Sequence, residues 1–272
     1  MAIKTLGKVS ANLIKTLYDQ NKVIFSIADV QKITRKNNRE AADLLSELAK
    51  RKVISRLKAG KYLIIPQEIG AVEKYIGNWL VAAKSIANSP DYYIAFYTAM
   101  DYWGMVTHPI TKIFVATPKR QISPKEMKNR LHFVFVNKKF VFGVNEEWIG
   151  KQEKVRISDV EKTILDGLFH PEYCGGITEI AGGIFMAREK INWQKILQCV
   201  KKYGKNVIAK RLGYILEILK IGDNRILYEL KEYIKGRYDL FDPTLPAKKK
   251  AKNNWRLVDN ISPEQIKKII SF

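Results

Sequence analysis

The segment from residue 25 to residue 66 constrains the fold most, because its hydrophobic periodicity changes there from helical to β-type. Ser26 can cap a short helix, since a serine oxygen accepts the free N–H groups of a first turn. A second helix is predicted over residues 38–52, where apolar residues recur at the spacing of one buried face: Ala41, Leu44, Leu45 and Leu48. Two β-rich runs, 53–57 and 61–65, flank a Lys-Ala-Gly turn and predict a hairpin. The order helix, tight turn, helix, hairpin predicts a winged helix-turn-helix.

Basic and amide side chains gather where the second helix of this motif begins, at the end that such helices insert into the major groove of DNA: Arg35, Lys36, Asn37, Asn38 and Arg39. Arginine and lysine hydrogen-bond guanine, and asparagine hydrogen-bonds adenine. The helix macrodipole disfavours cations at this end, so their clustering favours an anionic partner over a merely solvated helix start. Lys58 and Lys61, at the hairpin turn, are expected to contact phosphates. These seven residues are the predicted DNA-binding site.

Composition agrees with a polyanionic partner. The 272 residues carry a formal net charge of +21, which favours nucleic acid, although an acidic protein or a membrane surface would also attract a basic chain. No apolar run reaches the roughly 18–20 residues of a membrane span. The N-terminus lacks the pattern of a signal peptide, and Cys174 and Cys199 lack zinc-site spacing. We therefore expect a cytoplasmic protein without a cofactor, a metal or a membrane partner.

The remaining sequence predicts a second, mixed domain. Helical periodicity runs to about residue 105, with the aromatic stretch from Tyr92 expected in the core. Short β-rich runs follow, at 113–116, 131–136, 140–144 and 155–157, and helices return at Ser158, which with Glu161 fits a capping box. The predicted fold class is α+β. It comprises a winged helix-turn-helix over 1–66, a mixed domain with a small β-sheet and a C-terminal helical bundle over 70–240, and a basic linker and tail over 241–272.

Several short motifs occur in a fixed order behind the predicted winged helix: Asp91–Met100 with Trp103–Gly104, Val155–Ser158, Glu161–Asp166, His170–Pro171, Gly175–Gly176 and Lys210–Glu217. In this order and spacing the chain resembles the AbiEi family, the antitoxins and transcriptional repressors of type IV toxin–antitoxin systems in phage defence. The resemblance covers most of the sequence. It implies binding to operator repeats in double-stranded DNA, with a homodimer on DNA as a further expectation. It also implies an antitoxin domain that counters a nucleotidyltransferase-like toxin of the AbiEii type, and no enzymatic activity.

Other readings of the second domain stay open at the sequence level. Asp159, Glu161 and Asp166 could serve acid–base or metal chemistry in a nucleic-acid-processing enzyme, but helix capping and a pair between Asp166 and Lys162 explain them more simply. A winged-helix transcription regulator without a toxin partner is the other alternative. A second basic cluster could be solvated, contact DNA or meet an acidic partner, and the sequence does not choose: Lys201, Lys202, Lys205, Lys210 and Arg211.

Overall fold

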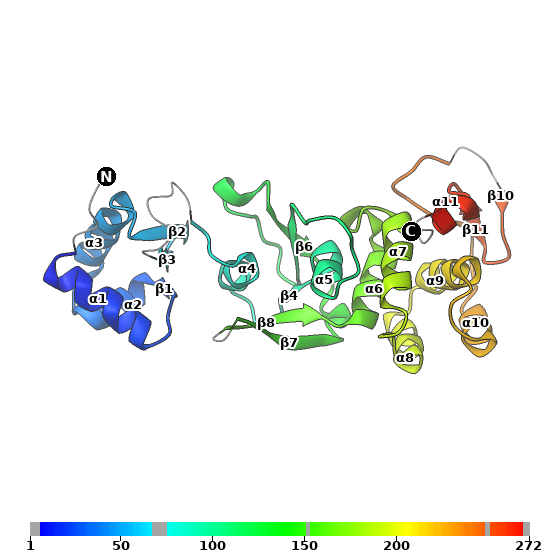
Figure 1. Ribbon diagram of the computed structural model, residues 1–272, viewed down its shortest axis with the longest axis horizontal. Coiled ribbons are helices and arrows are strands. Elements are labelled where there is room, and N and C mark those ends of the chain that lie inside the picture. The colour runs from blue at the N-terminus through cyan, green and yellow to red at the C-terminus, as the bar shows by residue number, and fades with distance from the viewer. Residues whose placement is uncertain (1–5, 67–74, 151–152, 248–250, 269–272) are drawn as a thin grey trace. The chain divides into compact units, whose positions relative to one another are not determined.

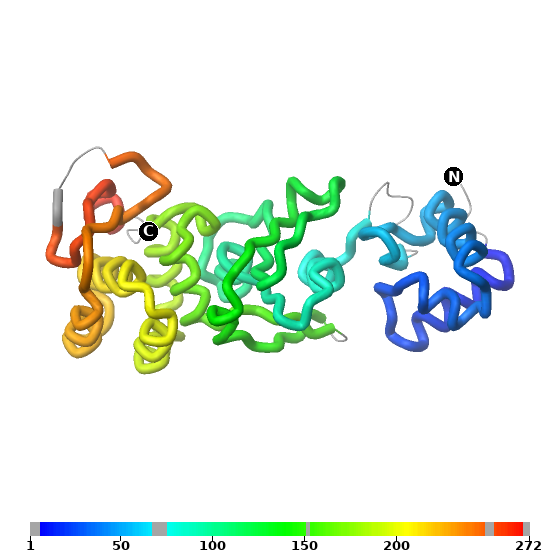
Figure 2. Tube along the Cα trace, turned by 180° about the vertical axis from the view of Figure 1, so that it is seen from behind, coloured from blue at the N-terminus to red at the C-terminus, as the bar shows by residue number. Residues whose placement is uncertain are grey.

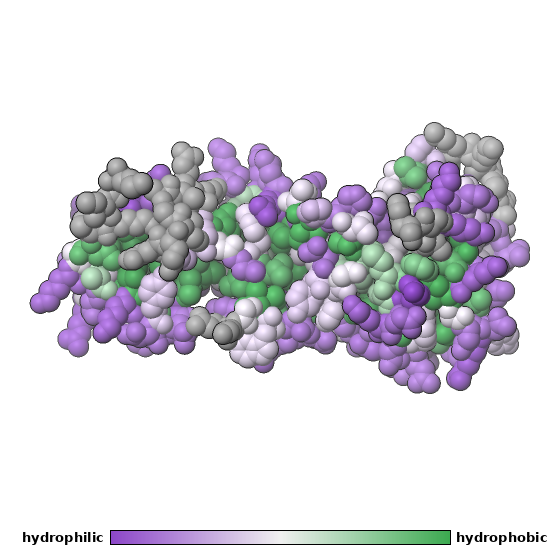
Figure 3. Space-filling model, in the orientation of Figure 1, coloured by the Kyte–Doolittle hydropathy of each residue, from purple (hydrophilic) through white to green (hydrophobic). Residues whose placement is uncertain are grey.

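The computed structural model describes residues 6–66, 75–150, 153–247 and 251–268 and shows a mixed α+β protein (Figure 1). Contacts divide it into two compact units. The first contains residues 1–90 with Ile122–Lys128 and Trp148–Val155, and the second contains the remainder. Hydrophilic side chains cover much of the visible surface, with hydrophobic residues showing between them (Figure 3). No helix in the described ranges is long and apolar enough to cross a membrane.

The N-terminal unit interleaves helices with a three-stranded sheet. Its elements are α1 (Lys8–Asp19), β1 (Ile24–Ser26), α2 (Ile27–Thr34), α3 (Asn38–Lys50), β2 (Ile54–Lys58), β3 (Lys61–Ile64) and α4 (Trp79–Ala87). The strand order is β1-β3-β2, and both pairings are antiparallel. The buried core draws on all three leading helices and the sheet: Leu13, Ile14, Leu17, Phe25, Val30, Ala41, Leu45, Leu48, Val53, Ile54 and Ile64. The predicted helix pair and hairpin are therefore present, and β1 is an additional strand that the sequence did not indicate.

The start of α2 is fixed by its capping residues. The hydroxyl oxygen of Ser26 accepts the N–H of Asp29 at 3.3 Å, and the Asp29 carboxylate accepts the N–H of Ser26 at 2.8 Å. The same carboxylate pairs with Lys22 at 2.7 Å. Burial raises the pKa of Asp29, but hydrogen bonds from Lys22 and Ser26 outweigh it and lower that pKa from 3.8 to about 2. The predicted Ser26 cap is confirmed.

The second unit is built on a five-stranded sheet of order β6-β5-β4-β8-β7. Its strands are β4 (Tyr93–Ile94), β5 (Ile113–Thr117), β6 (Leu131–Phe135), β7 (Val144–Ile149) and β8 (Glu153–Ser158). β4 pairs antiparallel with β5 and parallel with β8, and β5 pairs parallel with β6. Short 3-10 turns lie at Lys125–Met127, Lys138–Phe140 and Pro171–Tyr173.

Helices complete the second unit around α6, which packs against four others (Figures 1 and 2). The helices are α5 (Phe96–Tyr102), α6 (Val160–Phe169), α7 (Ile177–Ala187), α8 (Trp193–Tyr203), α9 (Asn206–Leu219), α10 (Asn224–Lys231) and α11 (Pro263–Lys268). Three short strands form a small separate sheet of order β10-β11-β9: β9 (Asp239–Leu240), β10 (Ala251–Lys252) and β11 (Leu257–Asp259). The C-terminal helical bundle predicted within residues 70–240 is present, as α6 to α10.

Several local predictions of caps and element bounds were wrong. The prediction that Ser10 caps the first helix is wrong, because Ser10 lies inside α1 and is buried, and the N-cap is Gly7. The N-cap of α6 is Asp159 rather than Ser158, because the Asp159 carboxylate accepts the N–H of Lys162 at 2.8 Å. Residues 140–144 do not form the predicted strand, since a 3-10 turn ends at Phe140 and the strand begins at Val144. The helix predicted from Tyr92 begins at Phe96, after β4.

The C-terminal segment is not the detached linker and tail that the sequence predicted. Phe241, Trp255 and Leu257 are buried in the main hydrophobic core of the second unit. The Trp255 ring lies against Gly213 of α9, where an added Cβ would overlap two atoms of the ring. Residues 241–247 and 251–268 therefore belong to the second unit, and Lys248–Lys250 lie outside the described residues. The predicted boundary at 66–70 stays a prediction, since residues 67–74 are also outside them, and contacts divide the chain at Pro90.

Candidate nucleic-acid interface

The turn between α2 and α3 depends on one residue in a left-handed conformation. Arg35, the C-cap of α2, has φ 56° and ψ 24°, and its N–H donates to the Gln31 carbonyl at 2.8 Å. A left-handed residue ends a helix by redirecting the chain. Three residues later the chain enters α3, so the turn is tight, as predicted. The Arg35 side chain is left exposed beside the start of α3.

A reciprocal capping box fixes the first turn of α3. The side-chain oxygen of Asn37 accepts the N–H of Glu40, and the Glu40 carboxylate accepts the N–H of Asn37, both at 3.0 Å. Reading adenine requires both the oxygen and the nitrogen of an asparagine side chain. The cap uses one of the two lone pairs of the Asn37 oxygen, so the base-reading role of Asn37 stays a prediction. Asn38 occupies the first helical position and is exposed.

Arg35 and Arg39 are the most accessible cations at this end of α3. Both are exposed, and neither side chain forms an ion pair or hydrogen bond within the described part of the chain. Lys36 lies 3.8 Å from the Glu40 carboxylate, whose side chain is 51% exposed. An exposed pair of this kind contributes little and leaves the lysine available to a stronger anion. Three of the five predicted residues at this turn therefore present positive charge to solvent.

The hairpin formed by β2 and β3 separates the two lysines predicted at its turn. The Lys58 ammonium donates to the Ile86 carbonyl at the end of α4, at 2.8 Å, and so fastens that helix to the hairpin. Burial, and then the charge of Lys61, lower the pKa of Lys58. The Lys61 side chain has no hydrogen bond or ion pair among residues 6–66 and 75–150 or in the later described ranges. Arg56 of β2 is exposed, whereas Lys61 is half-buried, and the sequence analysis did not include Arg56, although strand alternation places it opposite the buried Leu57.

Beyond its basic start, α3 presents mostly small side chains on its exposed face. Ala42, Asp43 and Ser46 are exposed, opposite the buried Ala41 and Leu45. Sequence reasoning singled out the buried face and the basic start but not these positions. The 3.6-residue period that located the buried face would have located them as well.

The second predicted basic cluster is divided by the structure. Lys210 and Arg211 are buried: Lys210 pairs with Asp239 at 2.7 Å, and Arg211 donates to the Leu240 carbonyl at 3.0 Å. Burial lowers the pKa of Arg211 to about 10, against the opposing effects of Asp239 and Asp242. These two residues hold the C-terminal segment onto α9 and are not a surface site. The exposed members are lysines of α8 and the residues after it: Lys201, Lys202 and Lys205.

The carboxylates of α6 are all bonded to groups of the protein itself. The sequence predicted that Glu161 takes part in a capping box, but Glu161 is buried and does not cap α6. It instead accepts the N–H of Asn192 at 2.8 Å and pairs with Lys195 at 2.8 Å, which anchors the start of α8. Asp159 also pairs with Lys195, at 3.0 Å. In the described ranges no group of three or more histidine, cysteine or acidic residues could hold a metal ion.

The predicted pair between Lys162 and Asp166 is confirmed, and it is completely buried, with side chains 0% and 1% exposed. The Tyr203 hydroxyl donates to Asp166 at 2.8 Å and that of Tyr93 at 3.1 Å. Lys162 also lies over the ring of Phe142, 5.1 Å from its centroid. Burial, then the charge of Asp166, raise the pKa of both tyrosines, so they stay protonated donors. The arrangement is a satisfied structural network inside the helical core.

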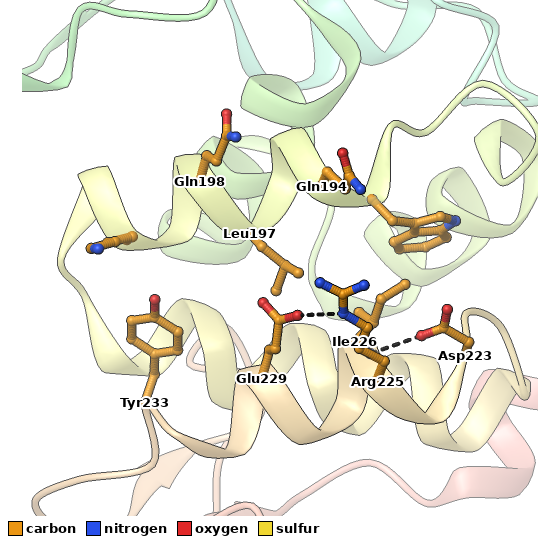
Figure 4. A pocket seen from close by; sticks show the side chains of 10 residues that line it. Gln194, Leu197, Gln198, Asp223, Arg225, Ile226, Glu229 and Tyr233 are labelled. Carbon is orange, nitrogen blue, oxygen red and sulfur yellow. Dashed lines mark hydrogen bonds and ion pairs between the residues drawn. The ribbon is translucent and has the colours of Figure 1, made fainter.

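A groove of about 460 Å³ lies between α8 and α10, which run side by side (Figures 2 and 4). Leu197 and Ile226 line its apolar part, and Tyr233 stands at one end (Figure 4). Arg225 pairs with Glu229 at 3.0 Å along its α10 wall. The groove is amphipathic, and its rim charges are partly neutralised by this pair.

Comparison with known proteins supports the fold alone. No protein-family model matches the chain, and no curated protein matches it. Among solved structures, the chain is similar to the Rv2827c protein from Mycobacterium tuberculosis, with a TM-score of 0.72 and 13% sequence identity. The match covers 100% of this chain and 97% of that one. The two proteins therefore share one architecture over nearly their full lengths.

Proposed function

We propose that the N-terminal unit is a winged helix-turn-helix that binds double-stranded DNA, with α3 in the major groove and the β2–β3 hairpin as the wing. The observation that supports this most strongly is the pair of exposed, unbonded cations, Arg35 and Arg39, beside a capped start of α3. A helix start of this kind is where such domains place their base-reading residues. Lys36, Lys61 and Arg56 supply further positive charge for phosphates.

The charge balance of the whole chain supports the same partner. A formal net charge of +21 attracts a polyanion at long range, and each neutralised phosphate releases condensed counterions. Binding should therefore weaken as salt is raised. An exposed guanidinium, unlike an ammonium, can also form two parallel hydrogen bonds to guanine, so Arg35 and Arg39 can add sequence preference to charge attraction.

The cellular role follows from the resemblance to the AbiEi family. The protein represses its own operon as a cytoplasmic regulator, by a homodimer on operator repeats, and its second unit counters a nucleotidyltransferase-like toxin. It has no catalytic activity of its own, a view supported by the protein-bonded carboxylates of α6. The alternative, a winged-helix regulator without a toxin, differs in the neighbouring gene and not in the DNA-binding unit.

DNA binding is tested by titrating full-length protein with a labelled duplex from upstream of its own gene and with a scrambled duplex of equal composition. The experiment is repeated at two salt concentrations. We expect tighter binding to the upstream duplex and a falling affinity with salt for both. Equal affinity for the two duplexes at both salt concentrations would contradict sequence-specific binding.

The antitoxin role is tested separately by survival. The neighbouring toxin gene is expressed from an inducible promoter that this protein cannot repress, with and without the full-length protein. Rescue by the Arg35→Ala/Arg39→Ala variant would show that protection does not require DNA binding. Failure of the wild-type protein to rescue at this promoter would mean that protection works through repression alone, which contradicts a role for the second unit.

A further inference from the structure

One acidic side chain on α3 has no bonded partner in the part of the chain that the structure describes. The helix contains three acidic residues: Glu40, Asp43 and Glu47. Glu40 belongs to the capping box with Asn37, and Glu47 pairs with Arg51 at 3.1 Å. The Asp43 side chain is exposed and forms no hydrogen bond or ion pair within the described residues. It lies one helical turn beyond Arg39, at i and i+4, yet no ion pair joins the two.

The neighbours of Asp43 leave it room to reach a partner. Ala42 and Ser46, on the same exposed face, are small. The buried side of the helix is held by Ala41, Leu45 and Leu48, which fixes the outward direction of the opposite face. In the orientation of the proposed function, Arg39 and Asp43 would therefore enter the major groove together.

A carboxylate in that position is repelled by phosphates and needs a hydrogen-bond donor to compensate. The major groove offers donors at the N4 amino group of cytosine and the N6 amino group of adenine. Adenine also presents the N7 acceptor beside its amino group, which a carboxylate cannot satisfy, whereas cytosine presents its amino group without an adjoining acceptor on the same base. Cytosine is therefore the base that fits Asp43.

We propose that Asp43 is a specificity-determining residue that selects a cytosine in the operator, an inference that rests on the proposed DNA binding by α3. Arg39, one turn earlier, selects a guanine nearby. Four residues of helix advance about 6 Å, which is close to two base-pair steps of about 3.4 Å. The guanine and the cytosine should accordingly lie about two base pairs apart in each half-site.

The test is selection of preferred duplexes from a random library by full-length protein, Asp43→Asn and Asp43→Ala. Asn hydrogen-bonds adenine in the major groove, so Asp43→Asn should move one cytosine position to adenine, and Asp43→Ala should remove the preference there. Asp19→Asn, an equal charge change at the exposed end of α1, is the matched control and should leave every position unchanged. Replacing the selected cytosine should weaken wild-type binding about tenfold and Asp43→Ala hardly at all.

The outcomes separate this inference from the proposed function. Sequence-specific binding with the same base preferences in wild type and both Asp43 variants would overturn the role of Asp43 and leave DNA binding intact. A shift produced equally by Asp19→Asn would also overturn it, because the effect would then be one of net charge. Failure of the wild-type protein to select or bind any duplex would overturn the proposed function, and this inference with it.

Discussion

Asn37 and Glu40 cap each other across the first turn of α3, each side chain accepting the backbone N–H of the other at 3.0 Å. Arg39 lies between them, and Arg35 lies just before them. The box therefore sets the point at which α3 begins and the direction in which these two cations leave the backbone. In the proposed complex, the first turn of α3 is therefore already formed before DNA is bound and does not have to be ordered on binding.

Removal of this cap should be measurable as stability. Asn37→Ala should lower the free energy of unfolding by about 1 kcal/mol, because the N–H of Glu40 loses its acceptor. Asn38→Ala is the matched control and should have little effect, since Asn38 forms no side-chain bond in the described ranges. Urea unfolding of the two variants would decide the matter, and equal losses would contradict the capping assignment.

The Asp29 carboxylate predicts a pH dependence for the N-terminal unit. Its folded pKa is about 2 against 3.8 when unfolded, so its stabilisation is fully present above about pH 4 and is lost as the pH falls through 2. We expect about 1 kcal/mol, since the partner Lys22 is 46% exposed and solvent screens the pair. The stability difference between wild type and Asp29→Asn, measured by urea unfolding, should be largest near pH 5 and vanish toward pH 2. A difference that does not change with pH would contradict it.

Lys58 and Lys61 should separate structural from DNA-contacting charge. Lys58→Met removes the bond to the Ile86 carbonyl and should lower the free energy of unfolding by about 1 kcal/mol. Lys61→Met should leave stability unchanged and reduce the slope of log affinity against log salt by about one phosphate contact. Thermal unfolding and DNA titration of both variants provide the two readouts. The reverse assignment of effects would place the phosphate contact at Lys58.

The buried pair in α6 should behave as one unit. Lys162→Met or Asp166→Asn alone should destabilise by about 3 kcal/mol, because each leaves an uncompensated polar group among the buried rings. The double variant should cost clearly less than the two single costs added together. Urea unfolding of the three variants measures this coupling, and simple additivity would show that the two side chains do not stabilise one another.

The hydrophobic pattern was sufficient for the parts of the fold with a long, regular period. Ala41, Leu45 and Leu48 located the buried face of α3, and Ser26 located the start of α2. The two-residue strand β4 was missed because Tyr92 and Phe96 have helical spacing and are both buried. Tyr92 precedes β4 and Phe96 begins α5, so the two do not share one helix. A two-residue strand has no period of its own and exists through its pairing with β5 and β8.

Long-range contacts account for the other errors. Nothing near Trp255 in the sequence indicates that its ring packs on Gly213, more than forty residues earlier in the chain, so the tail was read as a linker. Glu161 fits a capping box locally, but Lys195 and the N–H of Asn192 compete for it from α8. The sequence located the cations of the candidate site and of the second basic cluster. The fold was needed to show that Lys58, Lys210 and Arg211 are bonded to other groups of the protein.

The central claim is that α3 reads DNA through Arg35 and Arg39, and the most direct measurement is the ratio of operator to scrambled-duplex affinity. It is determined for wild type, for Arg35→Ala/Arg39→Ala and for Lys8→Ala/Lys15→Ala, which removes two exposed charges from α1 instead. We predict that the arginine variant loses most of this ratio, while the lysine variant binds both duplexes more weakly and keeps it. An unchanged ratio in the arginine variant would contradict the assignment of α3 as the reading helix.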